Sequence, residues 1–302
     1  MISINSITKR FARGVESRLA VDDLTFDITS GRVTGFVGPN GAGKSTTMRI
    51  MVGLTRADRG EVRFDGVTHR QLPHPSRVVG AVLDPRCMHP GRTARQHLRA
   101  TAAHGGIPSR RVDEVLDDVG LTSVANRRAG GFSLGMRQRL ALAGALLGEP
   151  NVLLLDEPSN GLDPQGIHWL RARLSAFAAA GGTVFISSHL ISELSIFADD
   201  LVVIGGGRLL AAESVAEMTR RVDRSVSVAT PSSAELLTLL RERHIDAIRI
   251  DDRIQVRGAS ADEISQLAHS HHLRITELSE VSTSLEDILL ELTRSATEFT
   301  AA

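Results

Sequence analysis

The sequence predicts an α/β domain with a parallel sheet, followed by a smaller α+β domain. Two continuous apolar runs, residues 152–155 and 183–187, have the composition of strands that are buried on both faces of a parallel sheet. An alanine-rich segment between them has the character of a helix, and an alternation of strand, helix and strand is typical of α/β domains. A third apolar run, residues 33–37, leads into a glycine-rich loop and a predicted helix over residues 45–52.

The other elements of this first domain follow from the spacing of apolar residues. Residues 21–28 mix apolar and acidic positions, which predicts a half-exposed strand. Between about residues 92 and 149 the pattern is helical, and Val112, Val115, Leu116 and Val119 recur at the spacing of one helix face. We therefore expect a first domain over residues 1–218 that contains a helical subdomain at about residues 88–149.

The composition changes near residue 220, and residues 219–302 predict a separate α+β domain. Their predicted order of strands and helices resembles the split βαβ type. The predicted strands are 226–229, 247–250, 254–257 and 273–278, and the predicted helices are 233–243, 261–271 and 284–293.

Charge and hydropathy exclude some classes of protein. The chain has 35 basic and 35 acidic residues, and this neutral balance disfavours a nucleic acid as partner, because a polyanion requires a net basic surface. The single cysteine, Cys87, cannot form an internal disulfide, which fits a reducing cytosolic compartment. The longest apolar run, Leu140–Gly148, is about half of the ~18 residues that a membrane-spanning helix needs. Any action at a membrane is therefore expected to go through a partner.

The residues before the predicted helix 45–52 fit the phosphate-binding pattern G-x-x-x-x-G-K-[ST]. Its glycines let backbone N–H groups surround phosphates, and the helix that follows points its N-terminus at them. In this pattern the lysine reaches the β- and γ-phosphates, and the hydroxyl of the following serine ligates Mg²⁺. The predicted phosphate-binding residues are Gly38, Pro39, Asn40, Gly41, Ala42, Gly43, Lys44, Ser45 and Thr46.

Two carboxylates, Asp156 and Glu157, end the buried strand 152–155. In open α/β sheets this C-terminal edge is where ligands bind. Because side chains alternate along a strand, Asp156 and Glu157 are predicted to point to opposite sides and to have different roles. We expect Asp156 to hold the metal ion, and Glu157 to face the γ-phosphate and polarise the attacking water.

Four motifs occur in one order along the chain: GPNGAGKST at 38–46, Phe132-Ser133-Leu134-Gly135-Met136, LLLDEPSNGLDP at 153–164, and Ser187-Ser188-His189. Together they resemble the nucleotide-binding subunit of an ATP-binding cassette (ABC) transporter, over about residues 1–215. The tail resembles the accessory domain of the drug-resistance and peptide-antibiotic exporter branch.

The resemblance implies a P-loop ATPase that pairs head-to-tail with a second copy of itself. Each ATP would lie between the phosphate loop of one subunit and the signature motif of the other. It places Ser133 and Gly135 of the signature at the partner's ATP, and Asp163 in a loop that crosses the interface. It also implies that His189 contacts the γ-phosphate and acts with Glu157 and Lys44 in hydrolysis.

Some positions depart from the commonest residues of the family. The signature has Leu134 and Met136 where glycine and glutamine are usual. Phe11 stands where the family stacks adenine on an aromatic residue, although a phenylalanine packed in the core would also fit. Asp84 stands where most members have a glutamine that touches Mg²⁺ and the membrane partner. The resemblance assigns Ser45, Asp156 and Asp84 to the metal, and Phe11 and Asp84 to the nucleotide site.

The expected function is that of an ATP-hydrolysing motor subunit of an ABC exporter, which drives efflux of a drug-like or antimicrobial substrate. It would be cytoplasmic and peripheral on the inner face of the cell membrane, where residues 85–105 would meet separate transmembrane permease subunits. The alternative is a soluble ABC ATPase that acts on the ribosome or DNA. Ribosomal members have two cassettes in one chain, whereas one phosphate loop occurs here. Residues 220–302 could also form a regulatory module that binds a small molecule or a protein.

Overall fold

The computed structural model describes residues 1–13, 16–84, 87–189, 191–220 and 224–282. The chain divides into two compact units, a first that contains Met1–Val215 and a second that begins at Ala216. Each unit has a hydrophobic core of its own. Within the described ranges, no helix is long and apolar enough to cross a membrane.

A six-stranded sheet in the order β5-β6-β7-β3-β8-β9 forms the centre of the first unit. The strands are β5 (Val79–Val82), β6 (Val152–Asp156), β7 (Thr183–Ser188), β3 (Val33–Val37), β8 (Asp200–Gly205) and β9 (Arg208–Ser214). The first five are parallel, and β9 is antiparallel to β8. Every residue of β3, β6 and β7 is buried, as their continuous apolar runs predict.

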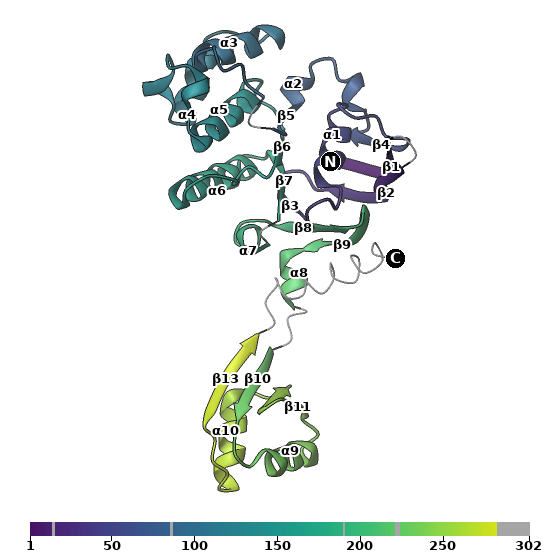
Figure 1. Ribbon diagram of the computed structural model, residues 1–302, viewed down its shortest axis with the longest axis vertical. Helices are drawn as coiled ribbons and strands as arrows, with labels where there is room; N and C mark the ends of the chain where they lie inside the picture. The colour runs from purple at the N-terminus through teal and green to yellow at the C-terminus, as the bar shows by residue number, and fades with distance from the viewer. Residues whose placement is uncertain (14–15, 85–86, 190, 221–223, 283–302) are drawn as a thin grey trace. The chain divides into compact units, whose positions relative to one another are not determined.

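Different elements cover the two faces of this sheet (Figure 1). One face is covered by α5 (Leu134–Leu146) and α6 (Pro164–Ala179), with the short α7 (Ile191–Leu194) nearby. On the other side lie α1 (Lys44–Met51) and an antiparallel sheet in the order β2-β1-β4. Its strands are β1 (Ile2–Arg13), β2 (Glu16–Ile28) and β4 (Arg59–Phe64). The predicted strand 21–28 is thus the second half of a longer strand.

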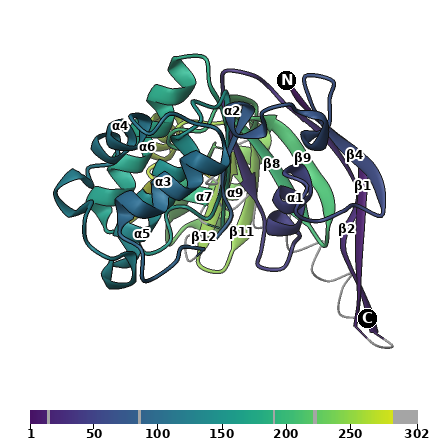
Figure 2. The same ribbon diagram turned by 90° about the horizontal axis from the view of Figure 1, so that it is seen from above.

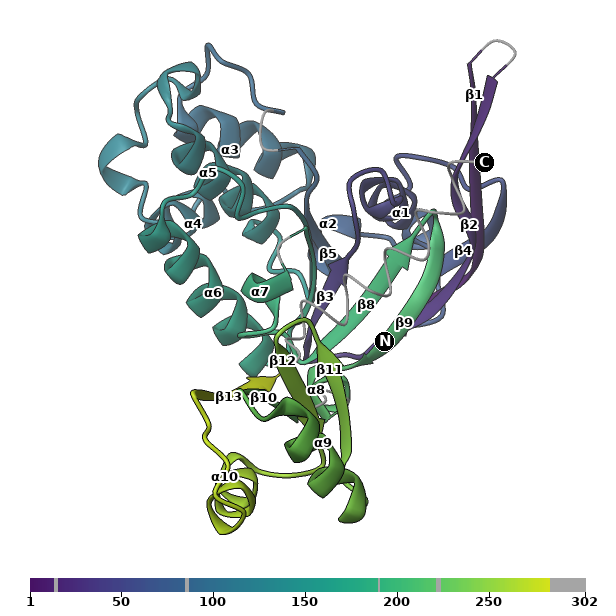
Figure 3. The same cartoon turned by 60° about the horizontal axis from the view of Figure 1, so that its bottom comes forward.

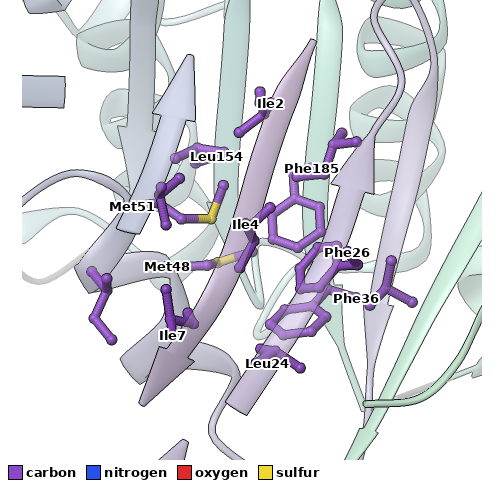
Figure 4. Packing of buried hydrophobic residues seen from close by; sticks show 14 of the residues in the cluster. Ile2, Ile4, Ile7, Leu24, Phe26, Phe36, Met48, Met51, Leu154 and Phe185 are labelled. Atoms are coloured by element: carbon purple, nitrogen blue, oxygen red, sulfur yellow. The ribbon is translucent and has the colours of Figure 1, made fainter. Parts of the chain in front are cut away.

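The main core lies between the two sheets and around α1 (Figure 4). Phe36 and Phe185 from the parallel sheet stack at a centroid distance of 4.9 Å, and Phe26 of β2 lies 5.8 and 5.9 Å from them. Aromatic pairs at this spacing add about 0.5–1.5 kcal/mol to the stabilisation from burial. Met48 and Met51 in the C-terminal half of α1 fill the space beside β1 and so hold the helix against both sheets.

The helical subdomain comprises α3 (Ala94–His104), α4 (Arg111–Asp118) and α5. In Figures 1 and 2 it lies away from the antiparallel sheet of the same unit. Val112, Val115, Leu116 and Val119 are all buried, which confirms the helical face predicted from their spacing. The remaining short elements of this unit are α2 (Pro75–Val78) and 3₁₀ turns at His69–Gln71, Thr122–Val124 and Ala129–Gly131. The helix α8 (Val215–Arg220) begins at the boundary, and all of it after Val215 belongs to the second unit.

The second unit is an antiparallel sheet in the order β11-β12-β10-β13 with two helices packed against it (Figure 3). This order of strands confirms the split βαβ arrangement. The elements are β10 (Arg224–Ala229), α9 (Ser233–Glu242), β11 (Asp246–Ile250), β12 (Arg253–Arg257), α10 (Ala261–Ser270) and β13 (Glu277–Ser282).

The last predicted strand was misplaced. Residues 273–278 were expected to form it, but strand pairing begins at Glu277, opposite Ala229. Leu273 and Ile275 are apolar because they pack on the core from the connection after α10, not because they belong to a strand. Their alternation with polar residues resembles that of a strand, but these residues do not pair with a neighbouring strand. The predicted helix 284–293 lies outside the described residues.

Candidate functional site

The phosphate-binding loop connects β3 to α1, and its shape depends on Gly43. This residue is the N-cap of α1 and has a φ of 109°, a left-handed conformation that glycine adopts without a steric cost. A Cβ added to Gly43 would lie 2.4 Å from the carbonyl oxygen of Ala20 in β2. The loop is therefore packed against β2 at a position where no side chain fits.

Lys44 is a buried cation in this loop, with 6% of its surface exposed. Its ammonium donates to the carbonyl oxygens of Gly38 at 2.7 Å and Pro39 at 3.4 Å. It also lies 3.6 Å from Oε1 of Glu157. A buried charge is costly unless it is paired and hydrogen-bonded, and these three oxygens satisfy that requirement. The lysine is thus directed along the loop towards the end of β6.

The neighbouring ends of β6 and β7 are joined by a residue for which the sequence predicted no role. Ser187 pairs with Asp156 in the strand register. Its hydroxyl donates to Oδ1 of Asp156 at 2.6 Å and accepts from the backbone N–H of Glu157 at 2.9 Å. One hydroxyl therefore orients the Asp156 carboxylate and anchors the backbone of Glu157.

Glu157 lies between two cationic or polar side chains. Its carboxylate is near Lys44 on one side, and Oε2 lies 2.7 Å from Nδ1 of His189 on the other. Glu157 has a φ of 48°, which costs a non-glycine residue on the order of 1–3 kcal/mol and is characteristic of functional sites. The residue follows the end of β6, and its carboxylate lies beside Lys44 at the phosphate-binding loop.

A cavity of about 460 Å³ brings half of the predicted nucleotide-binding residues together with Glu157 and His189. This is within the usual size range of ligand pockets, about 300–1,000 Å³. Of the predicted residues, Phe11, Asn40, Gly41, Gly43, Lys44, Ser45, Thr46, Glu157 and His189 line it.

A second cavity of about 310 Å³ contains the oxygens predicted to hold a metal ion. Ser45, Asp84, Asp156 and Glu157 all line it. Asp156 and Glu157 therefore share a cavity, contrary to the prediction that they point to opposite sides. The alternation rule fails here because β6 ends at Asp156 and the positive φ of Glu157 breaks the strand geometry.

The hydroxyl and carboxylate oxygens of this second cavity are the ligands that Mg²⁺ prefers. Among the described residues, no group of three or more His, Cys, Asp and Glu side chains could hold a metal ion by themselves. Mg²⁺ usually takes one or two protein carboxylates and completes its shell with phosphate oxygens and water. The residues present fit that kind of site.

Phe11 lies at the rim of the first cavity and is 46% exposed, so the alternative that it packs in the core is wrong. The Lys9 ammonium lies 5.4 Å from the centre of its ring and is held there by Asp58 at 2.9 Å. Hydrogen bonds from the Arg10 backbone N–H and from Lys9 keep the pKa of Asp58 below its usual value. An aromatic ring therefore stands exposed beside the loop, with a charged residue fixed next to it.

Ser133 and Asp163 begin two helices that cover the parallel sheet. The Ser133 hydroxyl accepts from the N–H of Met136 at 3.2 Å, and Oδ1 of Asp163 accepts from the N–H of Gly166 at 2.7 Å. Both residues are N-caps. Ser133, Gly135 and Asp163 do not line either of the two cavities, so one chain does not bring them to its own phosphate loop.

The first cavity also contains residues that the sequence did not single out, namely Arg18, Ala20 and Asn160. Arg18 is directly opposite Phe11 in the pairing of β1 and β2. That register contains several shifts, so the spacing of the residues along the chain could not have predicted the pairing. Asn160 follows Glu157 closely in the sequence, within the motif at 153–164.

Comparison with known proteins agrees with this geometry. Residues 21–160 match the ABC transporter family, and residues 224–286 match a domain of unknown function (DUF8746). The chain is 33% identical to the uncharacterized ABC transporter ATP-binding protein YhcH of Bacillus subtilis (strain 168), over 96% of both chains. It is 32% identical to the bacitracin transport ATP-binding protein BcrA of Bacillus licheniformis, over 97% of both chains.

Among solved structures, a dimeric ATP-binding cassette in a post-hydrolysis state, bound to ADP and Pi, matches with a TM-score of 0.66 and 25% identity. The match covers 71% of this chain and 99% of that one. The relatives match over nearly their whole length, and the phosphate-binding loop, Asp156, Glu157 and His189 stand in the order of that family's motifs. The chain belongs to the ABC transporter family, as one of its ATP-binding, ATP-hydrolysing subunits.

Proposed function

We propose that this chain is the motor subunit of an ABC exporter, and that it hydrolyses ATP in the cavity between Phe11 and His189. The observation that carries the proposal is the position of Glu157, whose carboxylate lies 3.6 Å from Lys44 Nζ and 2.7 Å from His189 Nδ1. A carboxylate in this position can accept a proton from, or orient, a water molecule that attacks the terminal phosphate.

Each residue of the cavity has a distinct part in this proposal. Phe11 stacks on adenine, since stacking requires only the face of an aromatic ring. The backbone N–H groups of residues 38–46 surround the phosphates, and Lys44 exchanges the carbonyls of Gly38 and Pro39 for phosphate oxygens. His189 donates to the γ-phosphate and keeps Glu157 oriented through their contact.

Ser45, Asp156 and Asp84 are the proposed ligands of Mg²⁺. When bound, the ion neutralises charge on the phosphate oxygens. Ser187 holds the Asp156 carboxylate in one orientation by its hydrogen bond of 2.6 Å. Asp84 adds a carboxylate to the same cavity, where the family usually has a neutral amide.

A second copy of the chain is the proposed partner for ATP hydrolysis. Ser133, Gly135 and Asp163 lie outside the nucleotide cavity of their own chain, which supports a head-to-tail dimer in which they reach the nucleotide of the other copy. The Ser133 hydroxyl and the N-terminus of α5 present hydrogen-bond donors to an anion. The matching cassette that binds ADP and Pi is itself a dimer.

Separate transmembrane permease subunits are the proposed partners for transport, with residues 85–105 as the contact surface. The chain would then be cytoplasmic and peripheral on the inner face of the membrane. The similarity to a bacitracin transport ATP-binding protein supports an antimicrobial or drug-like substrate.

We propose residues 1–218 as the ATPase domain and residues 219–302 as its accessory domain. The neutral charge and the single phosphate-binding loop disfavour the alternative of a soluble ATPase on the ribosome or DNA.

Transport can be tested in a bacitracin-sensitive host by co-expressing the chain with any multi-helix membrane protein that is found to be encoded beside its gene. We expect the wild type to raise resistance to at least one antimicrobial peptide or drug, and Lys44→Ala to abolish both the resistance and the ATPase activity. Normal ATP turnover by Lys44→Ala would contradict the site. Resistance that persists in Lys44→Ala would contradict the motor function.

A further inference from the structure

Arg18 is a cation in the nucleotide cavity for which the family motifs assign no role. It lies in β2, directly opposite Phe11 of β1, so both side chains emerge on the same side of this hairpin. Its Nη2 donates to the carbonyl oxygen of Gly41 in the phosphate-binding loop at 3.3 Å. The guanidinium therefore lies between the exposed ring of Phe11 and the loop.

Arg18 differs from many other arginines in the chain because it has no carboxylate partner among the described residues. Arg32, Arg63, Arg111, Arg173 and Arg253 each lie within 4 Å of a carboxylate. Within the described part of the chain, Arg18 has no carboxylate partner, and its one hydrogen bond is to a neutral carbonyl. Guanidinium bonds to anionic oxygens are shorter and about twice as strong as bonds between neutral groups. Arg18 is thus a charged donor that an anion in the cavity would attract.

We propose that Arg18 is a nucleotide-positioning residue that binds the α-phosphate of ATP and ADP. This inference rests on the proposed function of the cavity. If adenine stacks on Phe11 and the loop around Lys44 surrounds the β- and γ-phosphates, the covalent order of the nucleotide places its α-phosphate between them. Arg18 occupies that interval, and its forked donors match two phosphate oxygens.

The proposed contact predicts the same effect on the binding of all three adenine nucleotides. ATP, ADP and AMP all contain an α-phosphate, so removal of Arg18 should weaken all three by a similar factor. A contact made equally in the ground state and in the transition state changes KM without changing kcat. We therefore expect Arg18→Ala to raise the Kd of ATP and ADP, and the KM for ATP, by about tenfold, with kcat at saturating ATP within about twofold.

Arg10 supplies a matched control. It lies in the same hairpin, paired with Leu19, so its side chain emerges on the opposite side from Arg18. It hydrogen-bonds Ser17 and does not line the nucleotide cavity. Arg10→Ala removes the same charge from the same strands, so a general electrostatic effect on nucleotide binding would affect both variants equally.

The experiment is calorimetric titration of wild type, Arg18→Ala, Arg18→Lys and Arg10→Ala with ATP and ADP, and competition by AMP against a fluorescent ATP analogue. Arg18→Ala should weaken all three nucleotides alike, Arg18→Lys should recover part of the loss, and Arg10→Ala should bind as the wild type does. Equal binding by Arg18→Ala and wild type, equal losses in Arg18→Ala and Arg10→Ala, or a loss confined to ATP would each overturn the proposal. A wild type that binds no nucleotide would instead contradict the proposed function of the cavity.

Discussion

The Nδ1 atom of His189 lies 2.7 Å from Oε2 of Glu157, and this contact joins the ends of two strands that are distant in the sequence. The opposite oxygen of Glu157 lies 3.6 Å from Lys44. The glutamate is thus held from both sides, at a backbone φ of 48° that a helix or strand would not impose. The geometry fixes the Glu157 carboxylate next to the phosphate-binding loop.

Replacing Glu157 by glutamine should separate ATP binding from ATP hydrolysis. Glutamine retains the shape of the side chain but cannot act as a base, so we expect kcat to fall by about 10²–10⁴-fold while ATP binding persists. The variant should form an ATP-stabilised dimer that elutes earlier in gel filtration with Mg-ATP than without it. A variant that stays monomeric with Mg-ATP would contradict the head-to-tail dimer and the role of Glu157 as base.

Asp84 should lower the Mg²⁺ concentration that ATP hydrolysis needs. It is one of the acidic residues in the cavity that contains Ser45 and Asp156, and a carboxylate binds Mg²⁺ more strongly than an amide does. We expect Asp84→Asn and Asp84→Gln to raise the Mg²⁺ concentration that gives half-maximal ATPase activity. Asp84→Asn removes the charge and preserves the length. If both variants have wild-type Mg²⁺ dependence, Asp84 is not a ligand of the ion.

Ser187 should support the site through its two hydrogen bonds to Asp156 and Glu157. In Ser187→Ala the carboxylate of Asp156 and the N–H of Glu157 both lose a partner in a buried environment, which costs about 1–3 kcal/mol of unfolding free energy for each unsatisfied group. Urea denaturation measures the loss of unfolding free energy. Because Ser187 orients the Asp156 carboxylate, Ser187→Ala should also raise the Mg²⁺ concentration that gives half-maximal ATPase activity.

The hydroxyl of Thr34 provides the control for Ser187. It belongs to the same sheet and is buried, and it has no hydrogen-bond partner among the residues that the structure describes. Thr34→Val should therefore be neutral or slightly stabilising, because it removes an unsatisfied polar atom without changing the side-chain shape. A Thr34→Val variant as unstable as Ser187→Ala would mean that the hydrogen bonds of Ser187 contribute little.

Gly161 should be intolerant of a side chain because of Leu134 in the signature motif. Gly161 has a φ of 77°, and an added Cβ would lie 1.9 Å from Cδ2 of Leu134. Gly161→Ala should destabilise the protein more than Gly181→Ala does, since Gly181 has a φ of 93° but no atom of the described residues within 4 Å of its added Cβ. Leu134→Ala should relieve part of the cost in the double variant. Equal melting temperatures for the two glycine variants would contradict this contact.

Acid should destabilise the helical subdomain through His97. Burial, together with the positive charge of Arg92, lowers the pKa of His97 from its ordinary value of 6.5. Below pH 6.5 the unfolded chain therefore binds more protons at this site than the folded chain does, so the stability should fall as the pH falls. His97→Gln should show a smaller loss of melting temperature between pH 7 and pH 5 than the wild type. If the melting temperatures of His97→Gln and the wild type fall equally between pH 7 and pH 5, His97 does not cause the acid destabilisation.

The pattern of apolar residues along the chain was enough to predict those strands and helices whose buried positions repeat with the period of the element. The run 33–37 is a strand with all five residues buried, because a parallel strand covered on both faces needs an apolar residue at every position. Val112, Val115 and Leu116 face the core of the subdomain because they recur at the period of a helix. The pattern failed at Leu273 and Ile275, where packing on the core produced the alternation of a strand outside any strand.

By itself, the sequence predicted which residues have the chemistry for phosphate and metal: the loop 38–46, Asp156 and Glu157 follow from residue type and spacing, and His189 from the resemblance to the family. Only the tertiary structure decided how they act together. It placed Asp156 and Glu157 in one cavity, joined them through Ser187, exposed Phe11 and brought Arg18 beside it. These relationships depend on which strands are neighbours and on their register. Pairing between strands is set by the whole fold, so it leaves no regular spacing along the chain.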